Sequence, residues 1–312
     1  MVNKQKCFVS SVIYVHNAEK RISDFLEVII GAMEANFEHS EIICVNDCSD
    51  DRSLDVIRDC SSIAKTTNIT VINLSYFHGL EFAMNAGIDI AIGDFVFEFD
   101  TTFIDYDPQE IISVFMHSLE GFDIVSASPE RKERFSSALF YWVFERYSNN
   151  RYKLSTESFR VLSRRLINRV KSMNRAVPYR KALYVNSGFK TDVYKYKVVG
   201  SHNNKMDKRE KAYRSGLAVD ILLLFTELGY SFAKYMTIAM MILSILMLGY
   251  SILTYFMANP VEGWTTTVLF LSISFFGLFG ILTIVIKYLQ LIVNLIFKRS
   301  HYVYESIEKL TE

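Results

Sequence analysis

Short apolar runs alternate with stretches of helical periodicity in the first part of the chain. Five runs rich in apolar and β-branched residues predict strands, at 7–15, 41–45, 69–74, 95–99 and 122–126. Between them, apolar residues recur at helical spacing and predict helices, at 22–34, 53–64 and 80–92. Strands and helices that alternate in this way favour a largely parallel sheet with helices on both faces. The pattern therefore predicts an α/β domain.

A different pattern begins beyond Gly216, where the chain becomes strongly apolar. The runs 235–261 and 263–286 contain no Asp, Glu, Lys or Arg, and each exceeds the roughly 20 residues that span a bilayer. Between them lies a turn-forming cluster, NPVEGW at 259–264, whose tryptophan suits a membrane interface. We therefore expect two transmembrane helices joined by a tight turn.

Basic residues flank the two predicted spans on one side of the membrane. Lys234 precedes the first span, Lys287, Lys298 and Arg299 close the second, and the turn between them has no Lys or Arg. Because basic residues favour the cytoplasmic side, we expect a multi-pass protein of the inner (plasma) membrane with the large domain and both termini in the cytoplasm. The N-terminus is polar through Lys6, so no secretory signal is expected.

The segment between the two parts has the pattern of an amphipathic helix. Five apolar residues recur at helical spacing within 212–231: Leu217, Ile221, Leu224, Phe225 and Leu228. Such a helix would lie along the cytoplasmic leaflet, although a simple docking helix has the same pattern. The predicted domains are a cytoplasmic domain at 1–210, a juxtamembrane helix at 211–233, and a transmembrane hairpin with a short tail at 234–312. Gly277 and Gly280 would let helices of two protomers pack, which is compatible with a homo-oligomer.

The composition and the motifs argue against several classes of function. The chain has 34 basic and 34 acidic side chains, a balance that argues against nucleic acid as a partner. It has no GxGxxG or GxxxxGK[ST] motif, which argues against dinucleotide oxidoreductases and P-loop NTPases. The four cysteines and six histidines lack the spacing of a zinc site. Two spans without charged residues also offer no path for a transported substrate.

Two of the predicted strands lead into carboxylates. Asp100 follows the aromatic strand 95–99, and Asp47 follows the strand 41–45. In open α/β sheets the carboxyl ends of the strands face the ligand crevice. There one carboxylate could contact a nucleoside while the other holds a divalent cation and, through it, a diphosphate. The alternative is that Asp100 only caps a turn.

Three motifs follow one another in the first hundred residues: SVIYVHNAE at 11–19, VNDCSDD at 45–51, and a helix with a Gly-Asp turn at 83–94 that leads to Asp100. In order and spacing they resemble the opening strand, the VDDGSxD motif and the DxD site of family 2 glycosyltransferases with the GT-A fold. The resemblance implies a GT-A (nucleotide-diphospho-sugar transferase) domain with a mostly parallel central sheet.

Three later segments extend this resemblance: SASPERKER at 126–134, TESFRVLSR at 156–164 and KRSHYVYESIEKL at 298–310. They look like segments of the membrane-anchored, polyprenyl-phosphate type of this family, which includes bactoprenol glucosyltransferases and dolichol-phosphate mannose synthases. The resemblance implies an inverting hexosyltransferase of polysaccharide biosynthesis. Its donor would be a nucleotide-sugar and its acceptor polyprenyl (undecaprenyl) phosphate.

Carried over residue by residue, the resemblance implies that Asn17 and Glu19 line the nucleotide pocket and that Asp47 contacts the base or ribose. It implies that Asp100 leads the metal site, with Thr102 at the second position. Three arginines would meet the phosphate of the donor or the acceptor, because a guanidinium fork suits phosphate oxygens: Arg131, Arg134 and Arg160. The alternative is that the charged run 129–134 is an exposed loop.

The chain departs from the family pattern at the site itself. Thr102 stands where the family has a second metal-binding Asp, and Asn46 and Cys48 stand where it has an Asp and a Gly. Mg²⁺ often needs only one or two carboxylates plus substrate phosphates. A divalent metal, Mg²⁺ or Mn²⁺, is therefore expected at Asp100. With Thr102 at the second position, that site has only one acid. Two nearby acids are reserve ligands: Asp105 and Asp107.

The resemblance and the apolar spans together predict a membrane-bound glycosyltransferase that moves a sugar from a nucleotide-sugar to polyprenyl phosphate at the cytoplasmic face. The acceptor phosphate is already an anionic nucleophile, so this reaction needs positioning more than a general base. One alternative is transfer to a hydroxyl of a lipid-linked oligosaccharide in surface polysaccharide synthesis, which requires a base. The other is a catalytically weak membrane scaffold, which the missing second acid at Thr102 suggests.

Overall fold

The structure is a computed structural model of the whole chain. It describes residues 4–130, 156–172, 187–199 and 304–311, together with scattered residues between 180 and 292. The chain divides into two compact units. The first comprises residues 1–145, 150–218 and 300–312, and the second comprises residues 146–149 and 219–299.

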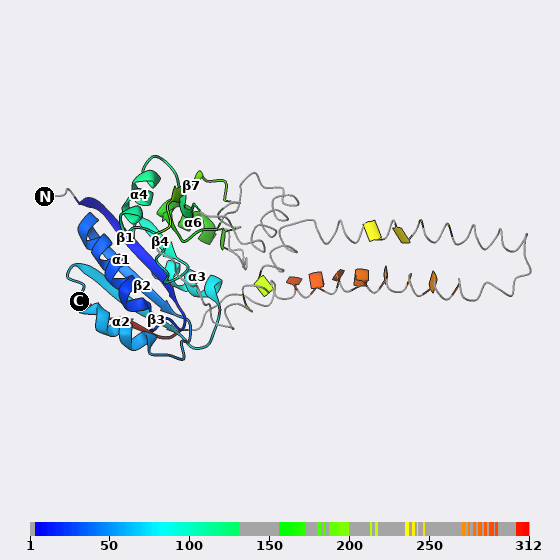
Figure 1. Ribbon diagram of the computed structural model, residues 1–312, viewed down its shortest axis with the longest axis horizontal. Helices are drawn as coiled ribbons and strands as arrows, with labels where there is room; N and C mark the ends of the chain where they lie inside the picture. Colours follow the sequence, from blue (N-terminus) through cyan, green and yellow to red (C-terminus); the bar gives the residue numbers. More distant parts are fainter. Residues whose placement is uncertain are drawn as a thin grey trace, which may run out of the picture. The chain divides into compact units, whose positions relative to one another are not determined.

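The first unit is built on one eight-stranded sheet in the order β7-β5-β6-β4-β1-β2-β3-β8 (Figure 1). The strands are β1 (Gln5–Val15), β2 (Phe37–Asn46), β3 (Thr67–Leu74), β4 (Phe95–Phe99), β5 (Ile124–Pro129), β6 (Phe159–Ser163), β7 (Thr191–Tyr196) and β8 (Tyr304–Lys309). The central pairs β4-β1, β1-β2 and β2-β3 are parallel, as is β5-β7. β6 and β8 run antiparallel to their neighbours. The expectation of a mostly parallel sheet is confirmed.

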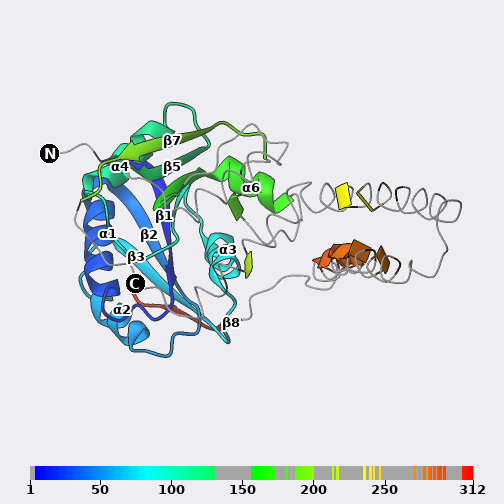
Figure 2. The same ribbon diagram turned by 45° about the vertical axis from the view of Figure 1, so that its right-hand side comes forward.

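Helices cover both faces of the sheet (Figure 2). They are α1 (Ile22–Asn36), α2 (Ser53–Ser61), α3 (Leu80–Ile90), α4 (Gln109–Ser118) and α6 (Arg164–Ser172). One apolar core joins the sheet to α1, α2 and α4, and a second joins its other face to α3 and α6. The central strands therefore have apolar residues on both sides, which explains why they are near-continuous apolar runs rather than alternating ones.

The predicted elements of the first hundred residues are confirmed. β4 has the predicted bounds, and α1, α2 and α3 start at the predicted residues. β2 begins earlier than predicted, because the polar residues of 38–41 hid its start. The sequence analysis did not anticipate α4, α6, or the strands β6, β7 and β8.

The turn before β4 fixes where that strand starts. The backbone amide of Gly93 donates to Ser10 Oγ at 2.8 Å, and the amide of Asp94 donates to the carbonyl of Phe8 at 2.7 Å. A Cβ on Gly93 would lie 2.6 Å from the backbone nitrogen of Ser10, so only glycine fits there. β4 is thereby locked against β1 in the register that pairs Ile13 with Phe99, and Asp100 emerges beside the end of β1.

The C-terminal segment contributes the edge strand β8. Arg58 on α2 forms a forked contact with Glu308, with nitrogen to oxygen distances of 2.9 Å and 3.1 Å. Asn73 donates to Ser306 Oγ at 2.8 Å, and the amide of Leu310 donates to the carbonyl of Ile69 at 2.9 Å. The end of the chain is thus part of the same sheet as its beginning.

Most residues of the predicted spans, 235–261 and 263–287, and of the predicted helix at 212–231 lie outside the described residues. In the part that is described, no helix is both long and apolar enough to cross a membrane. The scattered residues that are described between 235 and 292 are helical, and several carry exposed apolar side chains, such as Leu246 at 64% and Leu289 at 55%. The two spans therefore stay a prediction.

Candidate active site at the ends of β1 and β4

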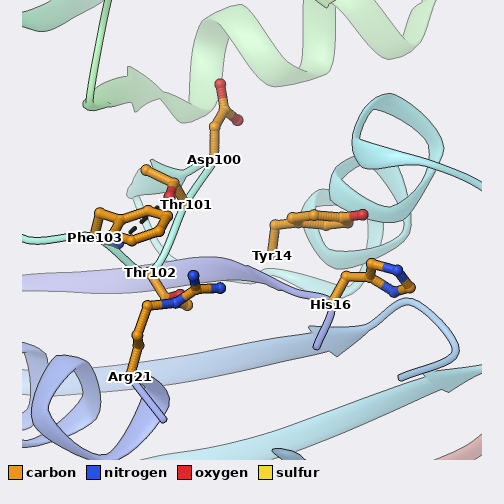
Figure 3. A pocket seen from close by; sticks show the side chains of 7 residues that line it. All are labelled: Tyr14, His16, Arg21, Asp100, Thr101, Thr102 and Phe103. Carbon is orange, nitrogen blue, oxygen red and sulfur yellow. Dashed lines mark hydrogen bonds between the residues drawn. The ribbon is translucent and has the colours of Figure 1, made fainter. Parts of the chain in front are cut away.

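A pocket opens where β1 and β4 end (Figure 3). Its lining comes from two segments: Tyr14, His16 and Arg21 from β1 and the start of α1, and Asp100, Thr101, Thr102 and Phe103 after β4. The space between these side chains, including its open mouth, is about 310 Å³. The pocket is therefore where the sequence placed the ligand crevice.

Asp100 lies at the end of β4 and lines this pocket, as predicted. Its Oδ1 accepts a hydrogen bond from Arg180 Nη2 at 2.6 Å, and its Oδ2 accepts one from Arg160 Nη2. Only 14% of its side chain is exposed. Asp100 thus lines the pocket, while the guanidinium groups of Arg160 and Arg180 hold the two oxygens of its carboxylate.

These contacts belong to a larger buried network, which we call the arginine–carboxylate cluster. Its members are Glu81, Glu98, Asp100, Glu157, Arg160, Arg180 and Lys181. Arg160 Nη1 donates to Glu98 at 2.7 Å and its Nε donates to Glu157 at 3.1 Å. Both Arg160 and Arg180 are 1% exposed. Four carboxylates face three cations, so the positive charge of this cluster is fully matched.

The electrostatics of the cluster favour the charged arginines. Burial lowers the pKa of Arg160, but Asp100, Glu98 and Glu157 outweigh it, and the pKa ends well above its usual value. Burial also raises the pKa of the Tyr184 phenol far above its usual range, so Tyr184 stays neutral and donates to Glu98 at 2.6 Å. Arg160 and Arg180 each bond one oxygen of the Asp100 carboxylate, which fixes its position, while the buried Nε of Arg180 lies 3.5 Å from Glu98 without a hydrogen bond.

The predicted phosphate-binding arginines fall in different places. Arg160 lies beneath Asp100 on β6, and its contact with phosphate stays a prediction. Arg131 and Arg134 lie outside the described residues.

The residues present do not fit the predicted divalent cation. Thr102 offers no carboxylate and is only 6% exposed, and both oxygens of Asp100 are held by guanidinium groups. Of the reserve ligands, Asp105 accepts from Tyr196 at 2.7 Å, and Asp107 accepts from the amide of Gln109 at the start of α4. Within the described residues, no group of three or more His, Cys, Asp or Glu could hold a metal ion. The divalent metal at Asp100 therefore stays a prediction.

Asp47 lies at the end of β2, but its carboxylate is fully buried. It accepts hydrogen bonds from the backbone amides of His78 and Gly79, both at 2.8 Å, and from the Tyr14 hydroxyl at 3.1 Å. Burial raises the pKa of Asp47, and these hydrogen bonds oppose that rise without cancelling it. Asp47 therefore anchors the start of α3 to the sheet, and its contact with a nucleotide stays a prediction.

Asn17 and Glu19 join the loop after β1 to the loop after β2. Asn17 Oδ1 accepts from the amide of Asp50 at 2.9 Å, and the Glu19 carboxylate accepts from the amide of Arg52 at 3.2 Å. In the other direction, the amide of Glu19 donates to Asp51 at 3.0 Å. Both residues thus brace the wall beside the pocket, and their contact with a nucleotide stays a prediction.

Cys48 has a left-handed backbone, with φ of +51°. The family pattern has glycine at this position, and glycine adopts this conformation without the clash that a Cβ brings. Cys48→Gly is expected to raise the free energy of unfolding by about 1 kcal/mol, measured by urea denaturation. Cys7→Gly, in β1, is the matched control and is expected to lower it. A loss of stability in Cys48→Gly would show that the thiol contributes more than the strain costs.

The sequence analysis missed Arg21, Phe103, Glu98 and Arg180. Glu98 carried a signal, because an acid inside an aromatic strand must find a buried cation. Arg21 also carried one, since it lies between a strand end and the first turn of a helix. No sequence signal pointed to Arg180, because it comes from a distant segment of the chain.

Together the pocket presents a guanidinium, a carboxylate edge and aromatic rings. Arg21 stacks over Phe103, with its guanidinium carbon 4.1 Å from the ring centre. A guanidinium suits phosphate oxygens and a carboxylate suits hydroxyl groups. The pocket therefore presents groups of the kinds that bind phosphate and sugar hydroxyls.

The model of the family described as "Glycosyl transferase family 2" matches residues 10–170. An uncharacterised glycosyltransferase of Synechocystis is 30% identical over 189 residues, 58% of each chain. A prophage bactoprenol glucosyl transferase homolog of Escherichia coli K12 is 28% identical over 200 residues, 60% of this chain and 62% of that protein. This chain therefore spans about three fifths of these two relatives.

Among solved structures, the mannosyltransferase PcManGT from Pyrobaculum calidifontis, in complex with GDP-Man and Mn²⁺, aligns with 95% of this chain and 89% of its own. Its sequence identity is 14% and the TM-score is 0.49. The family match covers more than half of the 312 residues, including the whole of the pocket described above. The sheet is that of a GT-A-like α/β fold, and the chain belongs to glycosyltransferase family 2.

Proposed function

We propose that the protein transfers a sugar from a nucleoside-diphosphate sugar to polyprenyl phosphate at the cytoplasmic face of the membrane. The observation that carries this proposal is the pocket in which Arg21 and Asp100 face one ligand space. The bactoprenol glucosyl transferase homolog supports the acceptor, because bactoprenol is a polyprenol.

In this reaction an oxygen of the acceptor phosphate attacks the anomeric carbon of the sugar. The bond between that carbon and the β-phosphate oxygen of the donor breaks, and the nucleoside diphosphate leaves with the electron pair. Attack from the face opposite the leaving group inverts the anomeric configuration. The nucleophile is already anionic, so the protein mainly has to orient the two substrates and stabilise the leaving charge. The exposed edge of Asp100 would accept a hydrogen bond from a sugar hydroxyl.

The membrane location is part of the same proposal. The apolar runs 235–261 and 263–286 are long enough to span a bilayer, and the exposed apolar side chains of Leu246 and Leu289 suit a lipid environment. A juxtamembrane helix at 211–233 would hold the catalytic domain near the acceptor, whose phosphate lies at the membrane surface. A homo-oligomer through Gly277 and Gly280 is compatible with this arrangement.

The deciding experiment incubates detergent-purified protein with undecaprenyl phosphate and a panel of UDP- and GDP-sugars, followed by mass spectrometry of the extracted lipids. A glycosyl-phosphoryl lipid is the expected product. A product that forms only on the hydroxyl of a lipid-linked oligosaccharide would replace this acceptor with the alternative one. Nucleotide binding without any product would favour the scaffold.

Asp100→Asn is expected to lower the rate of transfer by about 100-fold, in line with the loss of one charged group at a reacting centre. The amide keeps the shape of the side chain but presents an NH₂ group, which cannot accept from a sugar hydroxyl or a guanidinium. The measurement is the initial rate of lipid glycosylation, with Asp59→Asn on the exposed face of α2 as the matched control. An unchanged rate in Asp100→Asn would remove Asp100 from the active site.

A further inference from the structure

Arg21 is the one permanently charged cation among the seven residues that line the pocket. It lies between β1 and α1, and its Nη2 donates to the carbonyl of Asn17 at 3.4 Å. Figure 3 shows its side chain reaching toward the segment 100–103 from the opposite wall. The stacking on Phe103 holds the guanidinium within the ligand space.

The departing nucleoside diphosphate needs such a charge. Breaking the sugar–phosphate bond places extra negative charge on the diphosphate, which a divalent cation or a protein cation must offset. The acids near Asp100 do not fit a divalent cation, because Thr102 replaces the second one. Among the other described arginines near the pocket, Arg160 and Arg180 are each 1% exposed and paired with carboxylates of the arginine–carboxylate cluster, which leaves them little access to a ligand.

We propose that Arg21 binds the diphosphate of the donor directly and that donor binding does not depend on a divalent cation. This inference rests on the proposed function, which supplies the nucleoside-diphosphate donor. A guanidinium binds two phosphate oxygens in a forked geometry, and Arg21 lines the same pocket as Asp100.

The test is calorimetric titration of the detergent-purified full-length protein with UDP and with GDP, once with EDTA and once with Mn²⁺. Wild-type protein is expected to bind one of the two with the same affinity in both buffers. Arg21→Met keeps the apolar stem over Phe103 and removes the charge, so it is expected to weaken binding at least tenfold. Arg21→Lys keeps the charge without the fork and is expected to retain only part of the affinity. Arg165→Met, which removes an exposed arginine paired with Asp123, is the matched control.

The outcomes separate this inference from the function on which it rests. Binding that requires Mn²⁺ and is unaffected by Arg21→Met would overturn the role of Arg21 and leave the glycosyltransferase proposal standing. A wild-type protein that binds neither nucleotide in either buffer would overturn both. Full affinity in Arg21→Met with EDTA present would show that stacking, and not charge, is the contribution of this side chain. The unfolding midpoints of the variants, measured in parallel, exclude a loss of fold as the cause.

Discussion

Arg160→Leu is expected to lower the free energy of unfolding by about 3–5 kcal/mol, the usual cost of removing one partner from a buried ion pair. The guanidinium of Arg160 contacts Glu98, Asp100 and Glu157, and its side chain is 1% exposed. Without it, these three carboxylates lose a shared cation in a largely buried region, and only Arg180 and Lys181 remain to offset their charge. The measurement is urea denaturation followed by circular dichroism.

Two further variants decide whether pairing is the cause. Arg165→Leu removes an arginine of the same chain segment that is 71% exposed and bound to Asp123, and it should cost much less. The double variant Arg160→Leu/Glu98→Leu replaces a charge pair by apolar side chains and should regain part of the lost stability. If the double variant is no more stable than Arg160→Leu, the loss comes from packing and not from unpaired charge.

The arginine–carboxylate cluster also explains why the site was only half predictable. The position of Asp100 followed from local features, an aromatic strand behind a Gly-Asp turn, and the register with β1 then placed it at the sheet edge. Its partners are not local, because Arg160 lies 60 residues and Arg180 lies 80 residues further along the chain. No spacing rule connects them to Asp100, so the sequence could not show that two guanidinium groups hold its carboxylate.

The fold, too, has some elements that the local sequence predicts and others that it does not. The parallel strands near the N-terminus are apolar runs that can be recognised singly. β8 is different, since three of its six residues are charged and it forms a strand by pairing with β3, more than 200 residues earlier in the chain. β6 contains the buried Arg160, a residue that hydrophobic patterning does not place inside a sheet. The strands that the sequence could not predict are therefore those that depend on pairing between distant parts of the chain.

Asp47→Ala is expected to lower the free energy of unfolding by about 3 kcal/mol, because it leaves two buried backbone amides and one hydroxyl without their acceptor. The amides are those of His78 and Gly79 at the start of α3, and the hydroxyl is that of Tyr14. Asp47→Asn keeps one acceptor oxygen and should lose about half as much. Asp59→Ala, on the exposed face of α2, is the matched control and should change stability by no more than about 0.5 kcal/mol.

The same variants distinguish support of α3 from contact with the nucleotide. Tyr14 lines the pocket and bonds to Asp47, so a shift of Asp47 would reach the ligand through Tyr14. UDP and GDP affinities, measured where the variants remain folded, should therefore fall in step with the loss of stability, least in Asp47→Asn and most in Asp47→Ala. If stability is unchanged while affinity is lost, Asp47 is the nucleotide contact that the sequence predicts, and the buried carboxylate must turn toward the donor when it binds.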